Sequence, residues 1–383
     1  KSGKPFLASV NFLANHIPVQ APDSDIARYS AMYKDGWTAL RAARAKRAAA
    51  LGIVPVGAPI VTMATTPDWK KLDADARAAA VRVMQAYGGM ATAMDREVGR
   101  LVAHLKAAGE YENTIFVFLS DNGAEPTDPF NSLRNRLFLD MQYDLSTANI
   151  GRPGSFAAIG PGWASAAASP LSGYKFSATE GGLRVPLIIA WPGHADIRAG
   201  GISDGLAHVT DILPTLTELA GVPGHGGSWR GRAVEPVTGR SLVPMLKGGS
   251  GSVHGDAPLG YELSGNAALF RGDYKLVRNL APTGDGEWRL FNLKIDPGET
   301  RDLAAAEPDR FKTMMADYRA YAKANGVLDM PAGYTADEQI NRYAFEQQGK
   351  PRLIRFGLWV GGVIILLSAL IWGLRRRRSV RSE

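Results

Sequence analysis

The chain has 383 residues, of which 45% are hydrophobic and 9% aromatic, which is enough to bury one large or two modest cores and excludes disorder of the whole chain. The absence of cysteine excludes disulfide bonds, thiolate zinc sites and a cysteine nucleophile within these residues. Of the 44 basic and 37 acidic residues, eight basic and one acidic lie from Lys350 onward, so the net charge of +7 belongs to the C-terminal tail. The neutral remainder has no basic stripe, which excludes a nucleic-acid partner.

Apolar periodicity in the first quarter of the chain predicts a strand followed by helices. Lys4–Phe12 is predicted to be a short buried strand, and two prolines in the loop Asn15–Pro22 prevent a helix from continuing there. The Ala- and Arg-rich stretch Asp25–Ala50 is predicted to be helical. Asp73–Ala108 is predicted to be a long amphipathic helix, because its apolar residues recur three or four positions apart; Gly88–Gly89 is the point at which it could be interrupted.

Two apolar runs in the middle of the chain are predicted to be core strands. Thr114–Leu119 (TIFVFL) and Val185–Trp191 (VPLIIAW) are continuous apolar stretches, typical of strands buried on both faces of a parallel sheet. Between them, Ala124–Tyr174 is rich in Gly, Ser, Pro and Asn, and its length indicates a functional loop that shapes a substrate pocket. Val209–Ala220 is predicted to be a helix with polar residues at its start.

From about Ala257 the pattern changes to short apolar segments bounded by Gly, Asp or Pro. Ala267–Arg271, Tyr274–Asn279 and Trp288–Leu293 predict an antiparallel hairpin sheet, and a helix near Glu307–Asn325 is expected to lie against it.

The order of these elements predicts an α/β fold with a second, smaller part. Strands and long helices alternate first and hairpins follow, which indicates an α/β body with a C-terminal α+β subdomain. The predicted domains are residues 1–256, the α/β body, and residues 257–349, the subdomain, followed by residues 350–383.

A membrane anchor is predicted at the C-terminus. Phe356–Leu374 is an uncharged run of 19 residues, close to the roughly 20 that span a bilayer as a helix. Four arginines, Arg375–Arg378, follow it directly, whereas only Arg352 and Arg355 precede it closely. Because cytoplasmic flanks carry the excess of basic residues, we expect the C-terminus in the cytoplasm and the body outside it, in the periplasm or the extracellular space. The alternative interpretation is a buried core helix, but such a helix is seldom apolar on all sides and followed by four arginines.

The loop after the first core strand carries a candidate metal site. Ser120-Asp121-Asn122-Gly123 lies just past the carboxyl end of the predicted strand, where open α/β sheets bind their ligands. The carboxylate of Asp121 and the amide oxygen of Asn122 suit a hard cation such as Ca²⁺ or Mg²⁺. Asp-Asn-Gly is also an ordinary turn sequence, so spacing alone leaves both interpretations open.

Two further side chains are candidates for contact with an anionic substrate. His16 lies in a proline-flanked loop, where an imidazole can serve as a proton donor or acceptor, or bond only to the backbone. Lys175, at the end of the long loop, can present a point charge to an oxyanion or remain solvated. Glu180 and Arg184 follow it and could form a structural ion pair that holds the turn.

Taken in order, the motifs resemble those of an arylsulfatase from about Pro5 to Ala304. The loop HIPVQAP, the segment NTIFVFLSDNGAEP, and the lysine of GYKFSATEGGLRVPLIIAWPG followed by EGG make the resemblance specific; HVTDILPTLTELAGVP and WRLFNLKIDPGETRDLA extend it. On these residues the chain is identified as a member of the sulfatase family of the alkaline phosphatase superfamily. The resemblance implies an alkaline-phosphatase-like mixed sheet flanked by helices.

The resemblance also implies roles for four residues. Asp121 and Asn122 match the later Asp-Asn pair that, with an early Asp-Asp pair, holds Ca²⁺ or, in some members, Mg²⁺. His16 matches the family histidine that contacts the sulfate and the leaving group, and Lys175 matches the lysine that neutralises a sulfate oxygen. The implied reaction is metal-dependent hydrolysis of a sulfate monoester of a small molecule or a glycan.

His208 and Asp211 lie in a motif shared by the family. We interpret them as packing and helix-capping residues rather than catalytic ones.

The nucleophile of the family is absent from these residues. It is a formylglycine made from Cys or Ser in a Cys/Ser-x-Pro-x-Arg motif, and the chain contains neither this motif nor the early Asp-Asp pair. Because Lys1 stands where an initiator Met is expected, we expect the chain to start partway through the protein. Two alternatives stay open: a phosphonate or phosphate monoester hydrolase of the same superfamily, and a catalytically inactive membrane-tethered remnant. The sequence carries no signature of the alcohol part of the substrate, of the bound metal or of the oligomeric state.

Overall fold

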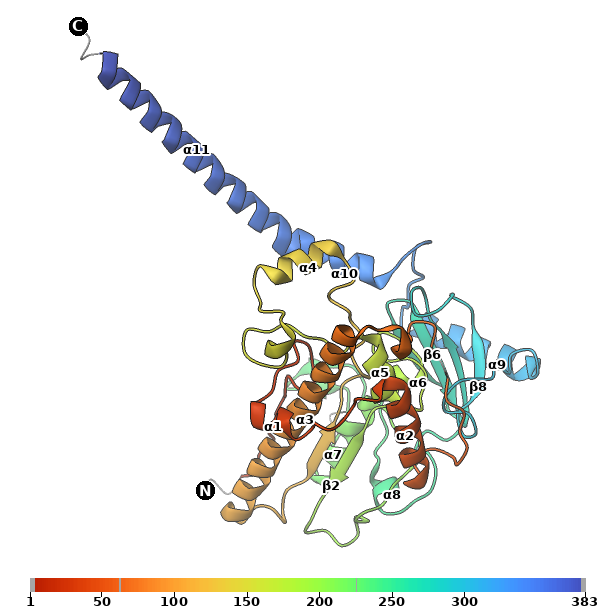
Figure 1. The fold of residues 1–383 in the computed structure, drawn as a ribbon. Helices are drawn as coiled ribbons and strands as arrows, with labels where there is room; N and C mark the ends of the chain where they lie inside the picture. Colours follow the sequence, from red (N-terminus) through yellow and green to blue (C-terminus); the bar gives the residue numbers. More distant parts are fainter. Residues whose placement is uncertain (1–3, 62, 225, 380–383) are drawn as a thin grey trace. The chain divides into compact units, whose positions relative to one another are not determined.

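A computed structural model describes residues 4–61, 63–224 and 226–379 (Figure 1). These residues form two compact units, one of residues 4–279 and 283–327 and the other of residues 280–282 and 328–379. The first unit contains helices α1 to α9 and strands β1 to β8, and the second contains helices α10 and α11.

The longest helix of the first unit is α3 (Ala74–Ala108), which agrees with the predicted amphipathic helix. Asp73 caps its first turn by accepting a backbone hydrogen bond at 2.8 Å, and Gly109 ends it in the left-handed conformation, with φ of 71°. The helix continues through Gly88–Gly89 without interruption. The short helix α1 (Asp23–Ala27) crosses α3 there, and a Cβ on Gly89 would lie 2.9 Å from the backbone of α1, so the glycines serve close helix packing.

The single helix predicted over Asp25–Ala50 is two helices, α1 and α2 (Gly36–Ala50). The chain turns between them at Tyr33 and Gly36, which both have positive φ, 72° and 80°. A side chain on Gly36 would overlap the ring of Trp69, because its Cβ would lie 2.2 Å from a ring atom. The turn therefore brings α2 against the aromatic centre of the core.

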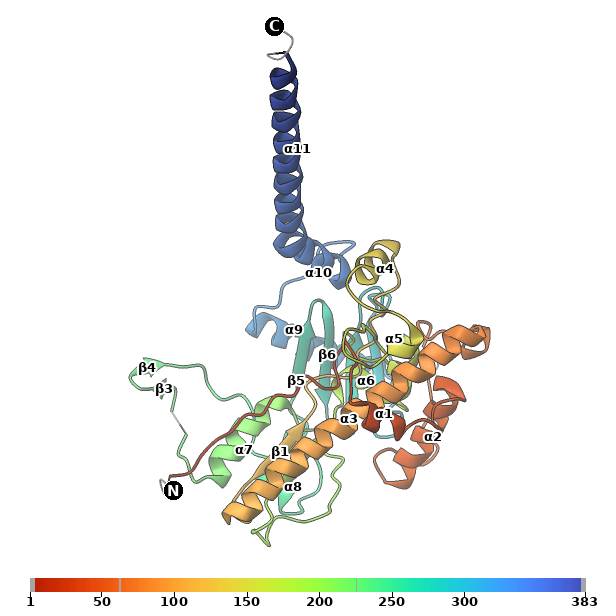
Figure 2. The same ribbon diagram turned by 60° about the vertical axis from the view of Figure 1, so that its left-hand side comes forward.

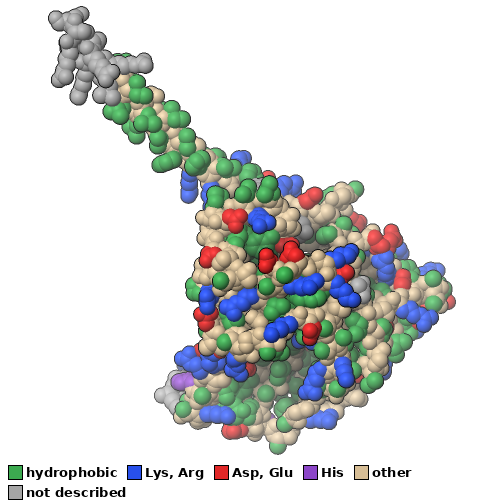
Figure 3. All heavy atoms as spheres, in the orientation of Figure 1, with side chains coloured by type: hydrophobic (Ala, Val, Ile, Leu, Met, Phe, Trp, Pro, Cys, Tyr) green, Lys and Arg blue, Asp and Glu red, His purple; other side chains and the backbone are tan. Residues whose placement is uncertain are grey.

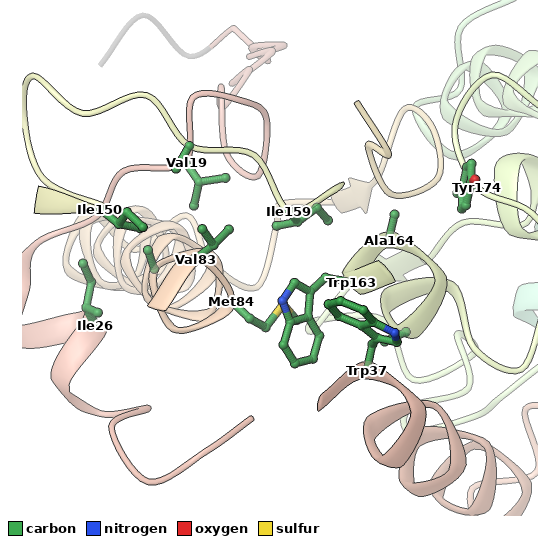
Figure 4. Close-up of a cluster of buried hydrophobic side chains, with 13 residues drawn as sticks. Val19, Ile26, Trp37, Val83, Met84, Ile150, Ile159, Trp163, Ala164 and Tyr174 are labelled. Carbon is green, nitrogen blue, oxygen red and sulfur yellow. The ribbon is translucent and has the colours of Figure 1, made fainter. Parts of the chain in front are cut away.

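The largest core cluster is centred on Trp163 of α5 (Gly160–Ala168), which is 1% exposed. The rings of Trp37 and Trp69 lie 5.5 Å and 5.8 Å from it, both edge-to-face or nearly so, a favourable geometry for aromatic rings. Figure 4 shows Trp37 and Trp163 side by side, with Met84 of α3 next to them. The indole N–H of Trp163 donates to a carbonyl of α3 at 2.9 Å, so the buried ring leaves no polar atom unsatisfied.

This core helix lies inside Ala124–Tyr174, the stretch predicted to be a functional loop. The stretch contains α4 (Leu133–Asp140), the 3₁₀ turn Thr147–Asn149 and α5. In α5 the proline occupies the first turn, where it is tolerated, and the alanines that follow favour a helix. The helices inside this stretch were not predicted, because its composition hid the start of α5. The functional role of the stretch stays a prediction.

The two core strands form, but their pairing differs from the prediction. Strands β1 (Phe116–Leu119) and β2 (Leu187–Ala190) run antiparallel, with Phe116 opposite Ala190. Within the described residues no third strand pairs with either of them, and Ile188 is 59% exposed. An apolar run specifies burial but not the direction of the neighbour, so the prediction of strands buried on both faces of a parallel sheet was wrong in this chain.

The strand predicted at Lys4–Phe12 is also not present. These residues have no regular structure, and Leu7 is 88% exposed. Apolar residues form a strand only where another strand pairs with them, and among the described residues none does so here.

The C-terminal part of the first unit confirms the predicted hairpin sheet. Four antiparallel strands are arranged in the order β5-β6-β7-β8, and α9 lies against the sheet (Figure 2). The elements are β5 (Leu259–Leu263), β6 (Asn266–Arg271), β7 (Tyr274–Arg278), β8 (Arg289–Asn292) and α9 (Pro308–Ala324). Leu269, Leu276 and Leu290 of the sheet and Met314 of α9 form their shared core. The domain boundary at residue 256 stays a prediction.

Shorter elements connect these parts, and α7 agrees with the helix predicted at Val209–Ala220. They are α6 (Glu180–Leu183), α7 (Ile212–Leu219), the hairpin of β3 (Ser228–Trp229) and β4 (Arg232–Ala233), and α8 (Val243–Leu246).

The second unit contains the predicted anchor segment. Helix α10 (Ala336–Ala344) leads through a π-helical turn, Phe345–Gly349, into α11 (Lys350–Ser379). The stretch Glu338–Trp372 is long and apolar enough to cross a membrane, with a mean hydropathy of 2.2 in its most apolar window, none of which is buried. On the face that Figure 3 shows, hydrophobic side chains predominate along the described part of α11. The side chains of Arg375–Arg378, on which the predicted orientation depends, lie outside the described ones.

Candidate active site

The loop that follows β1 lies against the turn that contains α6. Ser120 N donates to Pro186 O at 3.2 Å, and Gly123 N donates to Gly182 O at 3.0 Å. A Cβ on Gly123 would lie 2.0 Å from Gly181 O, so no larger residue fits without moving the backbone. The two glycine-containing motifs that the sequence singles out, SDNG and EGG, are therefore in direct backbone contact.

Lys175 and His16, which are 159 residues apart in the sequence, meet beside this loop. Lys175 N donates to Ala124 O at 3.0 Å, which attaches the lysine to the residue after Gly123. The ammonium Nζ of Lys175 lies 3.0 Å from His16 Nε2. His16 Nδ1 lies 2.9 Å from Ile17 O, and because a carbonyl oxygen only accepts, Nδ1 carries the proton. In the neutral ring, Nε2 is then an acceptor for Lys175.

Glu125 completes the cluster and was not predicted from the sequence. Its Oε2 lies 2.7 Å from Lys175 Nζ and 3.6 Å from His16 Nε2, and its Oε1 accepts hydrogen bonds from the amide and hydroxyl of Thr127. The side chain is buried. Burial alone would raise the pKa of Glu125, but the hydrogen bonds from Lys175 and Thr127 outweigh burial and hold that pKa below its ordinary value. The sequence signal that could have indicated Glu125 is the position of this carboxylate, three residues beyond Asn122 in the same loop.

Asp121 and Asn122 lie at the start of this loop with their side chains uncommitted. Asp121 is exposed and Asn122 half-buried, and among the described residues neither side chain makes a hydrogen bond or ion pair. Their oxygens fit a hard cation in kind, but two residues are fewer than the six to eight oxygen ligands of Ca²⁺. The described part of the chain holds no cluster of three or more His, Asp or Glu side chains that could bind a metal ion. The pair therefore suits part of a metal site.

The net charge of the cluster opposes the binding of an anion. Asp121 and Glu125 carry two negative charges, whereas Lys175 carries one positive charge and His16 has one ring nitrogen open to protonation. Asp121 is three residues from Ala124, so its Cα is within about 11 Å of the Cα of the residue bound to Lys175. With a neutral His16 the net charge is −1, which opposes anion binding; a divalent cation would change it to +1.

Comparison with known families agrees with these motifs. The family model described as Sulfatase matches residues 1–222, more than half of the chain. The chain belongs to the sulfatase family. It is similar to an uncharacterized sulfatase of Schizosaccharomyces pombe, with 34% identity over 340 residues that cover 87% of this chain and 60% of the relative. It is also similar to an arylsulfatase of Klebsiella aerogenes, with 35% identity over 240 residues that cover 62% of this chain and 51% of the relative.

This sulfatase-family chain thus spans 51% to 60% of the length of these two relatives. Among solved structures it resembles Ps i-CgsB, with a TM-score of 0.50 and 21% identity, over 89% of this chain and 54% of that one. A structure of Ps i-CgsB in complex with k-i-k-neocarrahexaose gives 0.51 and 22%, with the same coverage. Identities this low show a shared fold alone. The predicted family is confirmed, and the roles of His16, Lys175, Asp121 and Asn122 stay predictions.

A buried ion cluster supports the turn that contains the sulfatase EGG motif. Lys275 of β7 is fully buried, and its Nζ lies 2.8 Å from Glu180 Oε1 and 2.9 Å from Glu299 Oε1. Glu180 N donates to Glu299 Oε2 at 2.8 Å. Burial alone would lower the pKa of Lys275, but the two carboxylates outweigh burial and hold it above its ordinary value. The Glu180–Arg184 pair considered from the sequence is not formed, because Arg184 donates to a backbone carbonyl instead.

The motif that contains His208 and Asp211 has the structural role predicted for it. The His208 side chain and the Asp211 carboxylate form a reciprocal capping box at the 3₁₀ turn Val209–Asp211 before α7. The carboxylate of Asp211 is fully buried and also accepts from Arg240 N at 2.8 Å and lies 2.9 Å from His254 Nε2. Both of its oxygens thus have partners within the protein.

Proposed function

We propose that this chain takes part in the hydrolysis of a sulfate monoester at the cluster of Lys175, His16 and the loop after β1. The observation that carries the proposal is the 3.0 Å approach of Lys175 Nζ to His16 Nε2 beside that loop, in a chain of the sulfatase family. Two cationic or ionisable side chains at one point suit an oxyanion.

The two side chains have different tasks in this proposal. Lys175 neutralises charge on a sulfate oxygen while a nucleophile from outside these residues forms a bond to sulfur and the bond from sulfur to the alcohol oxygen breaks. His16, once protonated at Nε2, gives that proton to the departing alcohol or phenol oxygen. Glu125 positions the ammonium of Lys175 through the 2.7 Å contact, so that little reorganisation is needed when the sulfate arrives.

Asp121 and Asn122 are proposed to hold Ca²⁺ or Mg²⁺ together with ligands outside these residues. The bound ion would supply positive charge opposite the sulfate oxygens. The charge balance supports this part of the proposal, because the cluster without the ion is net negative and repels a sulfate monoester. Cation binding should therefore precede anion binding.

Calorimetry on the full chain tests the metal site without any enzymatic readout. Because the pair supplies only part of the site, Ca²⁺ should bind weakly to the unaltered chain. This binding should be lost in an Asp121→Ala, Asn122→Ala double variant and kept in Asp140→Ala, which removes an exposed carboxylate from α4. Binding of 4-nitrophenyl sulfate should be tighter after Ca²⁺ is added. Ca²⁺ binding that is indifferent to the double variant would contradict the metal role of the pair.

The sulfate specificity and the nucleophile require a second experiment. Sequencing upstream of Lys1 should find a reading frame that continues back to a Cys/Ser-x-Pro-x-Arg motif. A start codon that adjoins Lys1 would instead support an inactive remnant. In a protein that carries the motif, paired assays with 4-nitrophenyl sulfate and phosphate decide between sulfate and phosphate or phosphonate monoesters. There, Lys175→Ala should lower turnover on the order of a hundredfold, as for the loss of one oxyanion donor.

The apolar helix α11 is proposed to anchor the body at the outer face of a membrane. Its length and exposed apolar surface support this, and the arginines after it favour a cytoplasmic C-terminus. The chain should remain in the membrane pellet after alkaline extraction and be released by detergent. Release by alkali alone would contradict the anchor.

A further inference from the structure

Lys175, the proposed sulfate contact, lies in a tight turn of the backbone. Ser177 N donates to Tyr174 O at 3.2 Å, which closes a four-residue turn with Lys175 in its second position and Phe176 in its third. Phe176 has a φ of 73°, in the left-handed region that a residue with a large side chain seldom adopts. The turn sets the direction in which the Lys175 side chain leaves the backbone, so the contacts that hold the turn also position the ammonium.

Two asparagines of the C-terminal hairpin sheet bond to the backbone at and just after this turn. The side-chain amide of Asn266, the first residue of β6, donates to Phe176 O at 2.9 Å. The side-chain oxygen of Asn279, one residue past β7, accepts from Ala178 N at 2.6 Å. The partners are 90 and 101 residues apart in the sequence, so these bonds attach the turn to a separate element of the first unit.

Apolar and ionic contacts continue the attachment beyond the turn. Ala178 is fully buried and packs in one cluster with Ala268 of β6 and Val277 of β7. Two residues further on, Glu180 Oε1 lies 2.8 Å from Nζ of the buried Lys275 of β7. Strand β6 lies beside α6 in both ribbon views (Figures 1 and 2). The segment that follows the lysine is thus held by the sheet along its length.

We propose that Asn266 and Asn279 are positioning residues that hold Lys175 in place for a sulfate oxygen. The inference rests on the proposed function of Lys175. On one side of the turn Lys175 N donates to Ala124 O at 3.0 Å, and on the other side the two asparagines bond to the backbone. The turn is therefore clamped between the loop after β1 and the hairpin sheet.

The clamp matters because the lysine side chain is long and flexible. Its Nζ lies 2.7 Å from Glu125 Oε2 and 3.0 Å from His16 Nε2, and the side chain is only 17% exposed. A cation that is already in place loses less freedom when an oxyanion arrives. Release of the turn from the sheet should let the ammonium leave Glu125, which weakens anion binding and exposes the amine to reagents.

The chemical reactivity of Lys175 tests this position without any anion. The full chain in mild detergent is treated with limiting isotope-coded acetic anhydride, and the modification of each lysine is measured by peptide mass spectrometry. Asn266→Ala and Asn279→Ala should each raise the rate at Lys175 about threefold to tenfold, the effect of losing one neutral hydrogen bond. Asn279→Asp, which keeps an oxygen for Ala178 N, should restore the slow rate. The buried Lys275 should stay unreactive in every variant, which shows that the sheet is intact.

Asn292→Ala is the matched control in the same sheet. The side chain of Asn292 on β8 accepts from Lys294 N at 3.1 Å, so this variant also removes a bond from a side chain to the backbone, but not one to the turn of Lys175. Lys175 should react in it as in the unaltered chain. An unchanged rate at Lys175 in both Asn266→Ala and Asn279→Ala would overturn the inference. An equal rise in Asn292→Ala would also overturn it, because the sheet would then be loosened as a whole.

Binding of 4-nitrophenyl sulfate, with Ca²⁺ in excess, connects this position with the proposed function. In calorimetry Lys175→Ala should weaken the binding on the order of tenfold or more, the two asparagine-to-alanine variants about threefold to tenfold, and Asn292→Ala not at all. If the unaltered chain shows no binding, or if Lys175→Ala binds as tightly, the proposed sulfate contact fails and the inference fails with it. If Lys175→Ala weakens the binding and the asparagine variants do not, the contact stands and the inference alone is overturned.

Discussion

Lys175 Nζ and Glu125 Oε2 lie 2.7 Å apart, and His16 Nε2 lies 3.6 Å from the same carboxylate oxygen. Glu125 is thus a buried anion at the point where the two proposed sulfate contacts meet. A buried carboxylate keeps its charge only when it is paired, and here Lys175 and Thr127 provide the partners. The charge that an incoming anion meets is therefore set by Glu125 as much as by Lys175.

Replacing Glu125 by glutamine should strengthen anion binding by the metal-free chain. Glu125→Gln keeps an oxygen that accepts from Lys175 but removes one negative charge, so the dissociation constant for sulfate should fall on the order of tenfold, equivalent to about 1.4 kcal/mol. Calorimetry or a competition assay measures it. Glu97→Gln, which removes a more exposed carboxylate paired with Arg100 on α3, is the control and should leave the constant unchanged. Weaker sulfate binding in Glu125→Gln would show that the carboxylate does not oppose the anion.

The contact between the SDNG and EGG motifs should tolerate no side chain at Gly123. In Gly123→Ala the new Cβ would lie 2.0 Å from Gly181 O, so one of the two loops must move, and stability should fall by about 1 to 3 kcal/mol. Ca²⁺ binding should weaken with it, because Asp121 and Asn122 begin the same loop. Gly99→Ala in α3 is the control: its Cβ meets nothing within 4 Å, and helix propensity alone should stabilise the chain by about 0.5 to 1 kcal/mol. Equal stability of the two variants in urea unfolding would argue against the tight loop contact.

Local sequence signals predicted α3 and the hairpin sheet better than the pairing of β1 with β2. The start of α3 could be predicted because Asp73 and an apolar period of three to four residues mark it. Strands β6 to β8 could be predicted because Gly, Asp or Pro bound their segments, whereas β5 was not predicted. The pairing of β1 with β2 could not be predicted, since an apolar run does not encode the direction of its neighbour. Helix α5 was missed because its glycines and proline suggested a loop.

The site depends on contacts that no local pattern contains. The meeting of His16 with Lys175 joins residues 159 positions apart, and only the family resemblance placed them together. Glu125 carries no motif of its own, and its role in the cluster becomes visible only through the 2.7 Å contact with Lys175. The buried partner of Glu180 is likewise Lys275, far along the chain, rather than the nearby Arg184.

Removing Lys275 should strongly destabilise the first unit. Lys275→Met leaves Glu180 and Glu299 buried together without a cation, and breaking a buried ion pair on one side costs about 3 to 5 kcal/mol. Urea unfolding in mild detergent, followed by tryptophan fluorescence, measures the loss. Lys247→Met removes a lysine from an exposed pair with Asp196 and should change stability little. If both variants unfold at the same urea concentration, the buried cluster does not stabilise the EGG turn.

The same cluster should make stability depend on pH through Glu299. Burial raises the pKa of Glu299 to about 7, even though Lys275 opposes the rise. An unfolded glutamate titrates near 4.5, so between these values the folded chain binds more protons than the unfolded chain. The contribution of Glu299 to stability is therefore fully present below pH 4.5 and is lost as the pH rises through about 7.

Glu299→Gln removes this titration while keeping an oxygen that can accept from Glu180 N. Through Glu299, the unaltered chain should lose on the order of 2 to 3 kcal/mol of unfolding free energy between about pH 5 and pH 8. The variant lacks this loss, so its stability relative to the unaltered chain should rise by that amount over the same pH range. Urea unfolding across this pH range measures the difference. The control Glu97→Gln, which alters a carboxylate that is 41% exposed, should follow the unaltered chain at every pH. Parallel curves for Glu299→Gln and the unaltered chain would mean that Glu299 is ionised throughout, and that Lys275 compensates both carboxylates at once.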